Sequence, residues 1–232
     1  MKLFGSWPNA RKNRRKKSRP IKTYSQMGED LLIRFALSKV GVTKPNYLDI
    51  GAYDAVQLSN TMFFYQRGCS GVCIEPNPVL AKRFSKVRRR DTVLNVGVGD
   101  GKIGEAEFYV MSKPEFSSFN REICEGIAAT NHAKIVRRLQ VPLLSVDELA
   151  RDYFPAGIDF LSLDVEGWDE RVLESIDFEN IRPKVICVET IDFLTKGKRP
   201  EAALLLAQHD YIVFADTHIN TIFVDSRLLP KH

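Results

Sequence analysis

The chain has 232 residues, of which 44% are hydrophobic and 27% are charged. This length and composition fit one α/β domain of ordinary size and leave little room for a second domain. The apolar runs are much shorter than the ~20 residues of a transmembrane helix, and no apolar stretch follows the N-terminal cations. Neither a membrane span nor a secretory signal peptide is therefore expected.

The net charge of +5 is unevenly distributed along the chain. Residues 1–22 contain nine Lys or Arg and no acid, whereas residues 23–232 contain 25 basic and 29 acidic residues. We expect 1–22 to be a basic, disordered tail and 23–232 to be the single domain. The tail is either a solvated arm or an anchor to anionic lipid, nucleic acid or an acidic partner.

Beyond the tail, apolar runs typical of strands alternate with segments of helical periodicity. The first part of the chain is expected to form a helix at 25–40, a strand at 47–50, a helix at 60–66, a strand at 71–74, a turn at 76–78 with a helix to about 85, and a strand at 92–96. The middle part is expected to form a strand at 105–110, a helix at 122–138, a strand at 140–143 and a helix at 145–153. The last part is expected to form a strand at 160–164, a turn and helix at 166–175, a strand at 185–188, a helix at 199–209 and strands at 211–215 and 221–224. This alternation predicts a mainly parallel sheet with helices on both faces, in which the final hairpin inserts one antiparallel strand.

The turn after the strand at 47–50 and the end of the strand at 71–74 predict a nucleotide-like ligand. Glu75 ends the second of these strands, 24 residues after Gly51. A carboxylate in this position of a strand–turn–helix unit accepts hydrogen bonds from a ribose diol. The second and third glycines of a dinucleotide fingerprint are missing, and Tyr53 and Asp54 stand in their place. The turn therefore favours an adenosine ligand without phosphate, such as S-adenosylmethionine (SAM), over NAD.

Polar side chains also follow the other core strands. Five predicted strands end in an acid or an amide: Asp49, Glu75, Asn95, Asp164 and Glu189. Ligands of open α/β sheets bind at the carboxyl ends of the strands. Helix capping explains any one of these residues, but it explains all five poorly.

Six segments, taken in order, resemble the FkbM family of SAM-dependent methyltransferases over about residues 23–225. They are SQMGED at 25–30, LDIGA at 48–52 with SNT at 59–61, GVCIEPNP at 71–78, the serine pair at 117–118, LDVEG at 163–167 and VET at 188–190. The resemblance implies a class I methyltransferase (Rossmann-like) fold, with a seven-stranded, mainly parallel sheet and a C-terminal antiparallel hairpin. It also implies methyl transfer to a hydroxyl oxygen. Cys69 stands where the family often has Trp, which we expect to alter packing and not chemistry.

The resemblance and the residue chemistry assign the same cofactor contacts. Gly51 and Ala52 let the backbone pass close to the methionine part of SAM, and Asp49 and Asp54 are placed to hold its ammonium. Glu75 accepts the ribose hydroxyls. The full set of expected cofactor contacts is Gln26, Glu29, Asp49, Gly51, Ala52, Asp54, Asn60, Glu75, Asn77, Asn95 and Val96. For Gln26 and Glu29 the alternative is capping of a helix, and for Asn95 it is a role in a turn only.

Methyl transfer to a hydroxyl requires positioning of two reactants and removal of the hydroxyl proton. The candidate bases are Asp164, Glu166, Glu189 and His218. His218 is alternatively an ordinary surface histidine. A further hypothesis is that Asp164, Glu189 and His218 converge on a Mg²⁺ ion that lowers the pKa of the substrate hydroxyl.

Three other functions compete with an O-methyltransferase that acts on a small molecule or a glycan. One is a nucleic-acid methyltransferase guided by the basic tail, although the body is acidic and no aromatic stacking motif is present. Another is a non-catalytic binding module that retains the fold. A nicotinamide oxidoreductase is disfavoured by the missing glycines. The four cysteines form no CxxC pair, which favours core thiols in a reducing compartment and a cytoplasmic location.

Overall fold

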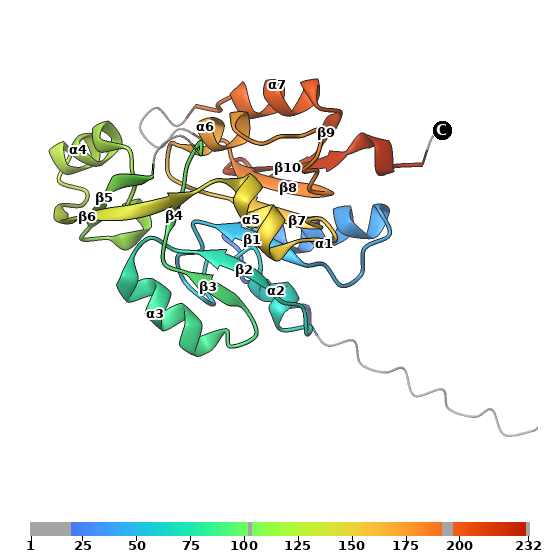
Figure 1. The fold of residues 1–232 in the computed structure, drawn as a ribbon, viewed down its shortest axis with the longest axis horizontal. Helices are drawn as coiled ribbons and strands as arrows, with labels where there is room; N and C mark the ends of the chain where they lie inside the picture. Colours follow the sequence, from blue (N-terminus) through green and yellow to red (C-terminus); the bar gives the residue numbers. More distant parts are fainter. Residues whose placement is uncertain (1–19, 102–103, 192–196, 231–232) are drawn as a thin grey trace, which may run out of the picture.

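The computed structural model describes residues 20–101, 104–191 and 197–230, and the basic segment at 1–19 lies outside this description. The domain is built on a seven-stranded sheet with helices on both faces (Figure 1). From one edge to the other the strands are β3 (Thr92–Leu94), β2 (Gly71–Ile74), β1 (Tyr47–Ile50), β7 (Phe160–Leu163), β8 (Val185–Glu189), β10 (Asn220–Asp225) and β9 (Tyr211–Asp216). β10 alone runs antiparallel to the other strands of this sheet. The predicted fold class, including the inserted antiparallel strand, is confirmed.

The central strands are short apolar runs because both of their faces are covered. Successive side chains of a strand point to opposite faces, and β1 shows the consequence. Tyr47 packs with α1 (Glu29–Lys39), α2 (Met62–Tyr65) and α3 (Pro78–Val87). Leu48 and Ile50 pack with the helices of the other face, which are α5 (Val146–Tyr153), α6 (Asp169–Glu174) and α7 (Glu201–Gln208).

A second, three-stranded sheet lies against the carboxyl ends of the main strands. It consists of β4 (Gly97–Val98), β6 (Ile135–Leu144) and β5 (Glu105–Met111), and it carries a 3-10 turn η1 (Pro114–Phe116) and α4 (Arg121–Ala129). The expected helix at 122–138 is therefore wrong in its second half. Asn131 adopts a left-handed φ of 57° just after α4, which ends a helix. The following residues pair with β5 along most of its length, so tertiary pairing decides their conformation.

The remaining boundaries differ from the expected ones by a few residues. α1 begins at Glu29 because Gly28 has a left-handed φ of 92°, although the Ser25 hydroxyl still accepts a hydrogen bond from the Asp30 N–H at 3.2 Å. The four cysteines are buried and free, as expected for core thiols. Within the described residues, no helix has the length and apolar character needed to cross a membrane.

Candidate active site

A cavity of about 460 Å³ lies at the carboxyl ends of β1, β2, β7 and β8. In the order of the sheet, β2 and β7 lie on opposite sides of β1. The cavity therefore occupies the point where the strand order reverses, the usual ligand site of open α/β sheets. The three-stranded sheet and η1 close its other side with apolar residues: Val98, Phe108, Pro114, Phe116 and Phe119.

Gly51 brings the ends of β1 and β7 together at the floor of this cavity. Its φ is +80°, and a Cβ atom at this position would lie 1.7 Å from the backbone oxygen of Asp164. The Asp164 N–H donates a hydrogen bond to the Ile50 carbonyl at 3.0 Å. Only glycine combines this left-handed conformation with so close an approach of the two chains.

Glu75 ends β2 and faces the cavity in a fixed orientation. One carboxylate oxygen accepts the Tyr53 N–H and the other accepts the Asn77 N–H, both at 2.8 Å. Burial raises the pKa of Glu75 to about 7, although these two backbone hydrogen bonds oppose the rise. Each oxygen keeps a second lone pair that can accept a hydrogen bond from a ligand.

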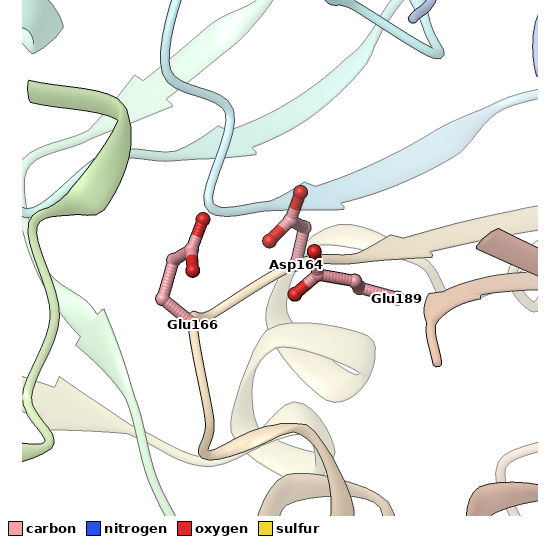
Figure 2. Close-up of side chains that lie close together, drawn as sticks. All are labelled: Asp164, Glu166 and Glu189. Carbon is pink, nitrogen blue, oxygen red and sulfur yellow. The ribbon is translucent and has the colours of Figure 1, made fainter. Parts of the chain in front are cut away.

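Three carboxylates from β7, the turn after it and β8 point toward one another across the cavity (Figure 2). Asp164, Glu166 and Glu189 each place a carboxylate oxygen within 4.8 Å of the other two. The Oδ1 atom of Asp164 is buried and has no hydrogen-bond partner among the described residues. We refer to these three residues as the carboxylate cluster.

Burial and mutual repulsion raise the pKa of every member of the carboxylate cluster. The pKa of Asp164 rises to about 7 through burial and the nearby charges of Asp169 and Asp49. Burial and the charges of the other acids raise the pKa of Glu189 to about 10, and burial and the Asp164 charge raise the pKa of Glu166 well above its ordinary value. At neutral pH the cluster therefore carries fewer than three negative charges.

Two residues that the sequence analysis did not select hold this cluster in place. Asp169 is fully buried and accepts the Val165 and Gly167 N–H groups at 3.1 and 3.2 Å. These bonds fix the turn in which Glu166 adopts a left-handed φ of 51°. Arg199 lies 3.7 Å from Asp169 and 3.8 Å from Glu189 and supplies positive charge.

The serine pair of the FkbM-like segments supports the same turn. The Ser118 hydroxyl donates to the Glu166 carbonyl at 2.7 Å and accepts the Asn120 N–H at 2.9 Å. Ser117 lines the cavity and accepts the Met111 N–H at 3.0 Å. The pair therefore anchors the η1 segment to the carboxylate cluster.

Of the other predicted cofactor contacts, only Gln26 lines the cavity. The rest are outside its described lining: Glu29, Asp49, Ala52, Asp54, Asn60, Asn77, Asn95 and Val96. Two acids expected to hold the ligand ammonium have other partners. Asp49 accepts the Thr61 hydroxyl at 2.5 Å, and Asp54 caps the turn that follows it and pairs with Arg83 at 3.3 Å.

The other residues of this group have structural partners. The Glu29 carboxylate accepts hydrogen bonds from Thr217 at 2.8 Å and Asn220 at 3.1 Å, which tie the start of α1 to the β9–β10 turn. Asn77 caps α3. Asn60 donates to the Ser162 hydroxyl at 3.2 Å, and Asn95 donates to the Glu75 carbonyl at 2.8 Å. These side chains therefore make contacts within the fold and lie outside the described lining of the cavity.

His218 does not join the predicted metal triad. It is exposed in the β9–β10 turn, with a left-handed φ of 75°, and is outside the described lining of the cavity. Glu166 takes the third position beside Asp164 and Glu189. The expected convergence of Asp164, Glu189 and His218 is therefore corrected to the carboxylate cluster.

Comparisons with known proteins gave one family match and several solved structures of similar fold. The family model described as "Methyltransferase FkbM domain" matches residues 49–218. A precorrin-6y C5,15-methyltransferase from Geobacter metallireducens GS-15 has a similar fold, with 15% sequence identity, coverage of 78% of this chain and 71% of that chain, and a TM-score of 0.42. An O-methyltransferase from Bacillus cereus in complex with SAH has 10% identity, coverage of 88% of this chain and 82% of that chain, and a TM-score of 0.39. A 1,6-didemethyltoxoflavin-N1-methyltransferase from Burkholderia thailandensis has 12% identity, coverage of 84% of this chain and 77% of that chain, and a TM-score of 0.39.

No curated protein sequence matches the chain significantly. The family match covers well over half of the chain and includes the ends of β1, β2, β7 and β8, where the cavity lies. The chain belongs to the FkbM family of methyltransferase domains.

Proposed function

We propose that the protein is a SAM-dependent methyltransferase that transfers a methyl group to a hydroxyl oxygen of a small molecule or a glycan. Family membership supports the methyl transfer. The observation that carries the hydroxyl acceptor is the carboxylate cluster, because a hydroxyl nucleophile must lose its proton during transfer. These three side chains line the cavity together with Glu75.

The charge of the cavity fits SAM. Its described lining contains five acids and no Lys, Arg or His; the acids are Glu75, Glu115, Asp164, Glu166 and Glu189. Such a lining favours a cationic ligand and disfavours a diphosphate or a nucleic-acid strand. SAM carries both a sulfonium and an ammonium, and when bound it supplies an activated methyl group. We assign Glu75 to the ribose hydroxyls.

Asp164 is the best-placed proton acceptor of the carboxylate cluster. Burial and neighbouring acids place its pKa at about 7, and a general base works best when its pKa lies near the working pH. Its buried Oδ1 atom has no hydrogen-bond partner among the described residues, and Asp164 lines the cavity. Burial and the neighbouring acids raise the pKa of Glu189 to about 10, so Glu189 stays protonated at neutral pH and adds no negative charge beside Asp164.

A transfer assay tests this proposal. Labelled methyl transfer from SAM would be measured for a panel of phenols, sugar alcohols and oligosaccharides, with amines of matching size as controls. We expect labelled hydroxyl products with wild type and with Asp54→Asn, which changes an acid outside the cavity lining, and their loss with Asp164→Asn. Labelling of amines alone, or full transfer by Asp164→Asn, would contradict a hydroxyl acceptor served by Asp164.

Mg²⁺ at the carboxylate cluster is the second candidate, favoured by three carboxylate oxygens within 4.8 Å of one another. Carboxylates are the ligands that this ion prefers, so Asp164, Glu166 and Glu189 fit it chemically, and the ion would lower the pKa of a bound hydroxyl. Transfer that survives EDTA supports proton acceptance by Asp164. Transfer that stops with EDTA and returns with Mg²⁺ would replace that assignment.

A further inference from the structure

One helix of the domain presents a basic outer face that the proposed methyl transfer does not use. Along α3, Val79, Lys82, Arg83 and Lys86 are spaced at i, i+3, i+4 and i+7 and are exposed, so they share one side of the helix. Ala81 and Phe84 point into the core from the other side. Figure 1 shows α3 at the outside of the molecule. We call Val79, Lys82, Arg83, Lys86, Val87, Arg89 and Arg90 the α3 basic face.

The charge of this region opposes that of the rest of the domain. Residues 55–90 contain seven basic residues and a single acid, Glu75, which faces the cavity, whereas the rest of 23–232 contains 18 basic and 28 acidic residues. Arg83 pairs with Asp54, but the Arg83 side chain is 69% exposed. The Arg90 guanidinium lies over the Tyr65 ring in a cation–π contact. Among the described residues, Lys82 and Lys86 form no ion pair within 4.0 Å.

The α3 basic face also exposes apolar side chains. Val79 is 71% exposed and Val87 is 44% exposed, on the same helix as the cations. A helix that carries Lys and Arg beside exposed aliphatic residues suits a membrane interface, where the cations meet anionic headgroups and the apolar groups enter the acyl boundary. The exposed valines favour a membrane over a nucleic-acid strand, because most protein contacts to nucleic acid are hydrogen bonds to phosphate and sugar.

We propose that the α3 basic face binds the surface of a membrane that contains anionic phospholipids. Lys82 and Lys86 contact the headgroups, and Val79 enters the interface.

Sedimentation with vesicles tests this proposal on the full chain. Wild type would be mixed with phosphatidylcholine vesicles, with and without phosphatidylserine, and compared with Lys82→Gln/Lys86→Gln and Val79→Ser. A matched control, the β6 control, is Lys134→Gln/Arg137→Gln, which neutralises two exposed cations, one just before β6 and one near its start. At roughly fivefold per cation, the Lys82/Lys86 variant is expected to bind phosphatidylserine vesicles about 25-fold more weakly, and Val79→Ser about fivefold more weakly. The β6 control should bind as wild type does, and thermal unfolding should show that all variants are folded.

Several results would overturn the proposal. Equal binding by wild type and the Lys82/Lys86 variant would assign membrane binding to the N-terminal segment alone. An equal loss in the β6 control would indicate a general charge effect. Absence of binding to phosphatidylserine vesicles, combined with binding of a duplex DNA or RNA fragment that depends on Lys82 and Lys86, would make the face a nucleic-acid surface.

Discussion

Replacement of Gly51 by alanine tests how closely β1 and β7 approach beneath the cavity. Its φ of +80° is a left-handed conformation, and its Cβ atom would lie 1.7 Å from the Asp164 carbonyl oxygen. The conformation alone costs alanine about 1–2 kcal/mol, and relief of the overlap by moving the strand ends apart costs about 1–3 kcal/mol more. We expect Gly51→Ala to lower the free energy of unfolding by about 3 kcal/mol in total.

Gly41→Ala is the matched control for this substitution. Its φ of +77° is almost the same, but no atom lies within 4 Å of the position of its Cβ, so only the conformational cost of about 1–2 kcal/mol applies. Urea-induced unfolding followed by circular dichroism measures both variants. Equal losses of stability in the two variants would refute the close approach of Gly51 to Asp164.

Three further predictions follow from the buried charges. Asp164→Asn should lower kcat by a factor of about 10²–10⁴ while SAM binding is retained. The kcat/KM of the wild type should fall as the pH drops below the Asp164 pKa of about 7, and a flat pH profile would contradict the role of this carboxylate. Because the folded-state pKa of Glu189 is raised to about 10, the contribution of this group to stability is present at acid pH and is lost as the pH rises from 4.5, the ordinary pKa, toward 10. Glu189→Gln should therefore raise the unfolding free energy by roughly 4–5 kcal/mol at pH 8 and by much less at pH 5. Arg88→Met should lower the free energy of unfolding by about 3–5 kcal/mol, because it leaves the buried Asp91 side chain without its 2.7 Å ion pair. A decrease of less than about 1 kcal/mol in urea unfolding would show that this pair is not needed.

The strands that carry the site were predictable because each is a short, almost wholly apolar run that ends in a polar residue. Glu75, Asp164 and Glu189 lie at the carboxyl ends of β2, β7 and β8, which run parallel in one sheet, so their placement at the same edge of the sheet follows from topology. The second half of the expected helix at 122–138 failed because pairing with β5 outweighs local helical preference there.

The directions of the Asp49 and Asp54 side chains do not favour the ammonium-binding roles expected for them. Strand alternation places Asp49 on the same face as Tyr47, in the layer of α1–α3 and away from the cavity edge. Asp54 turns toward the backbone of the following residues and toward Arg83. Arg199 had no recognisable signal, because its contact with Glu189 depends on how the chain returns after β8.

Calorimetric titration of SAM tests the central claim most directly. The account predicts that the full chain binds SAM and S-adenosylhomocysteine, that NAD does not bind, and that Glu75→Gln weakens SAM binding while Asp54→Asn leaves it unchanged. Failure of the folded wild-type chain to bind SAM, or preferential binding of NAD, would contradict a SAM site at the end of β2 and favour a binding module or a nicotinamide enzyme.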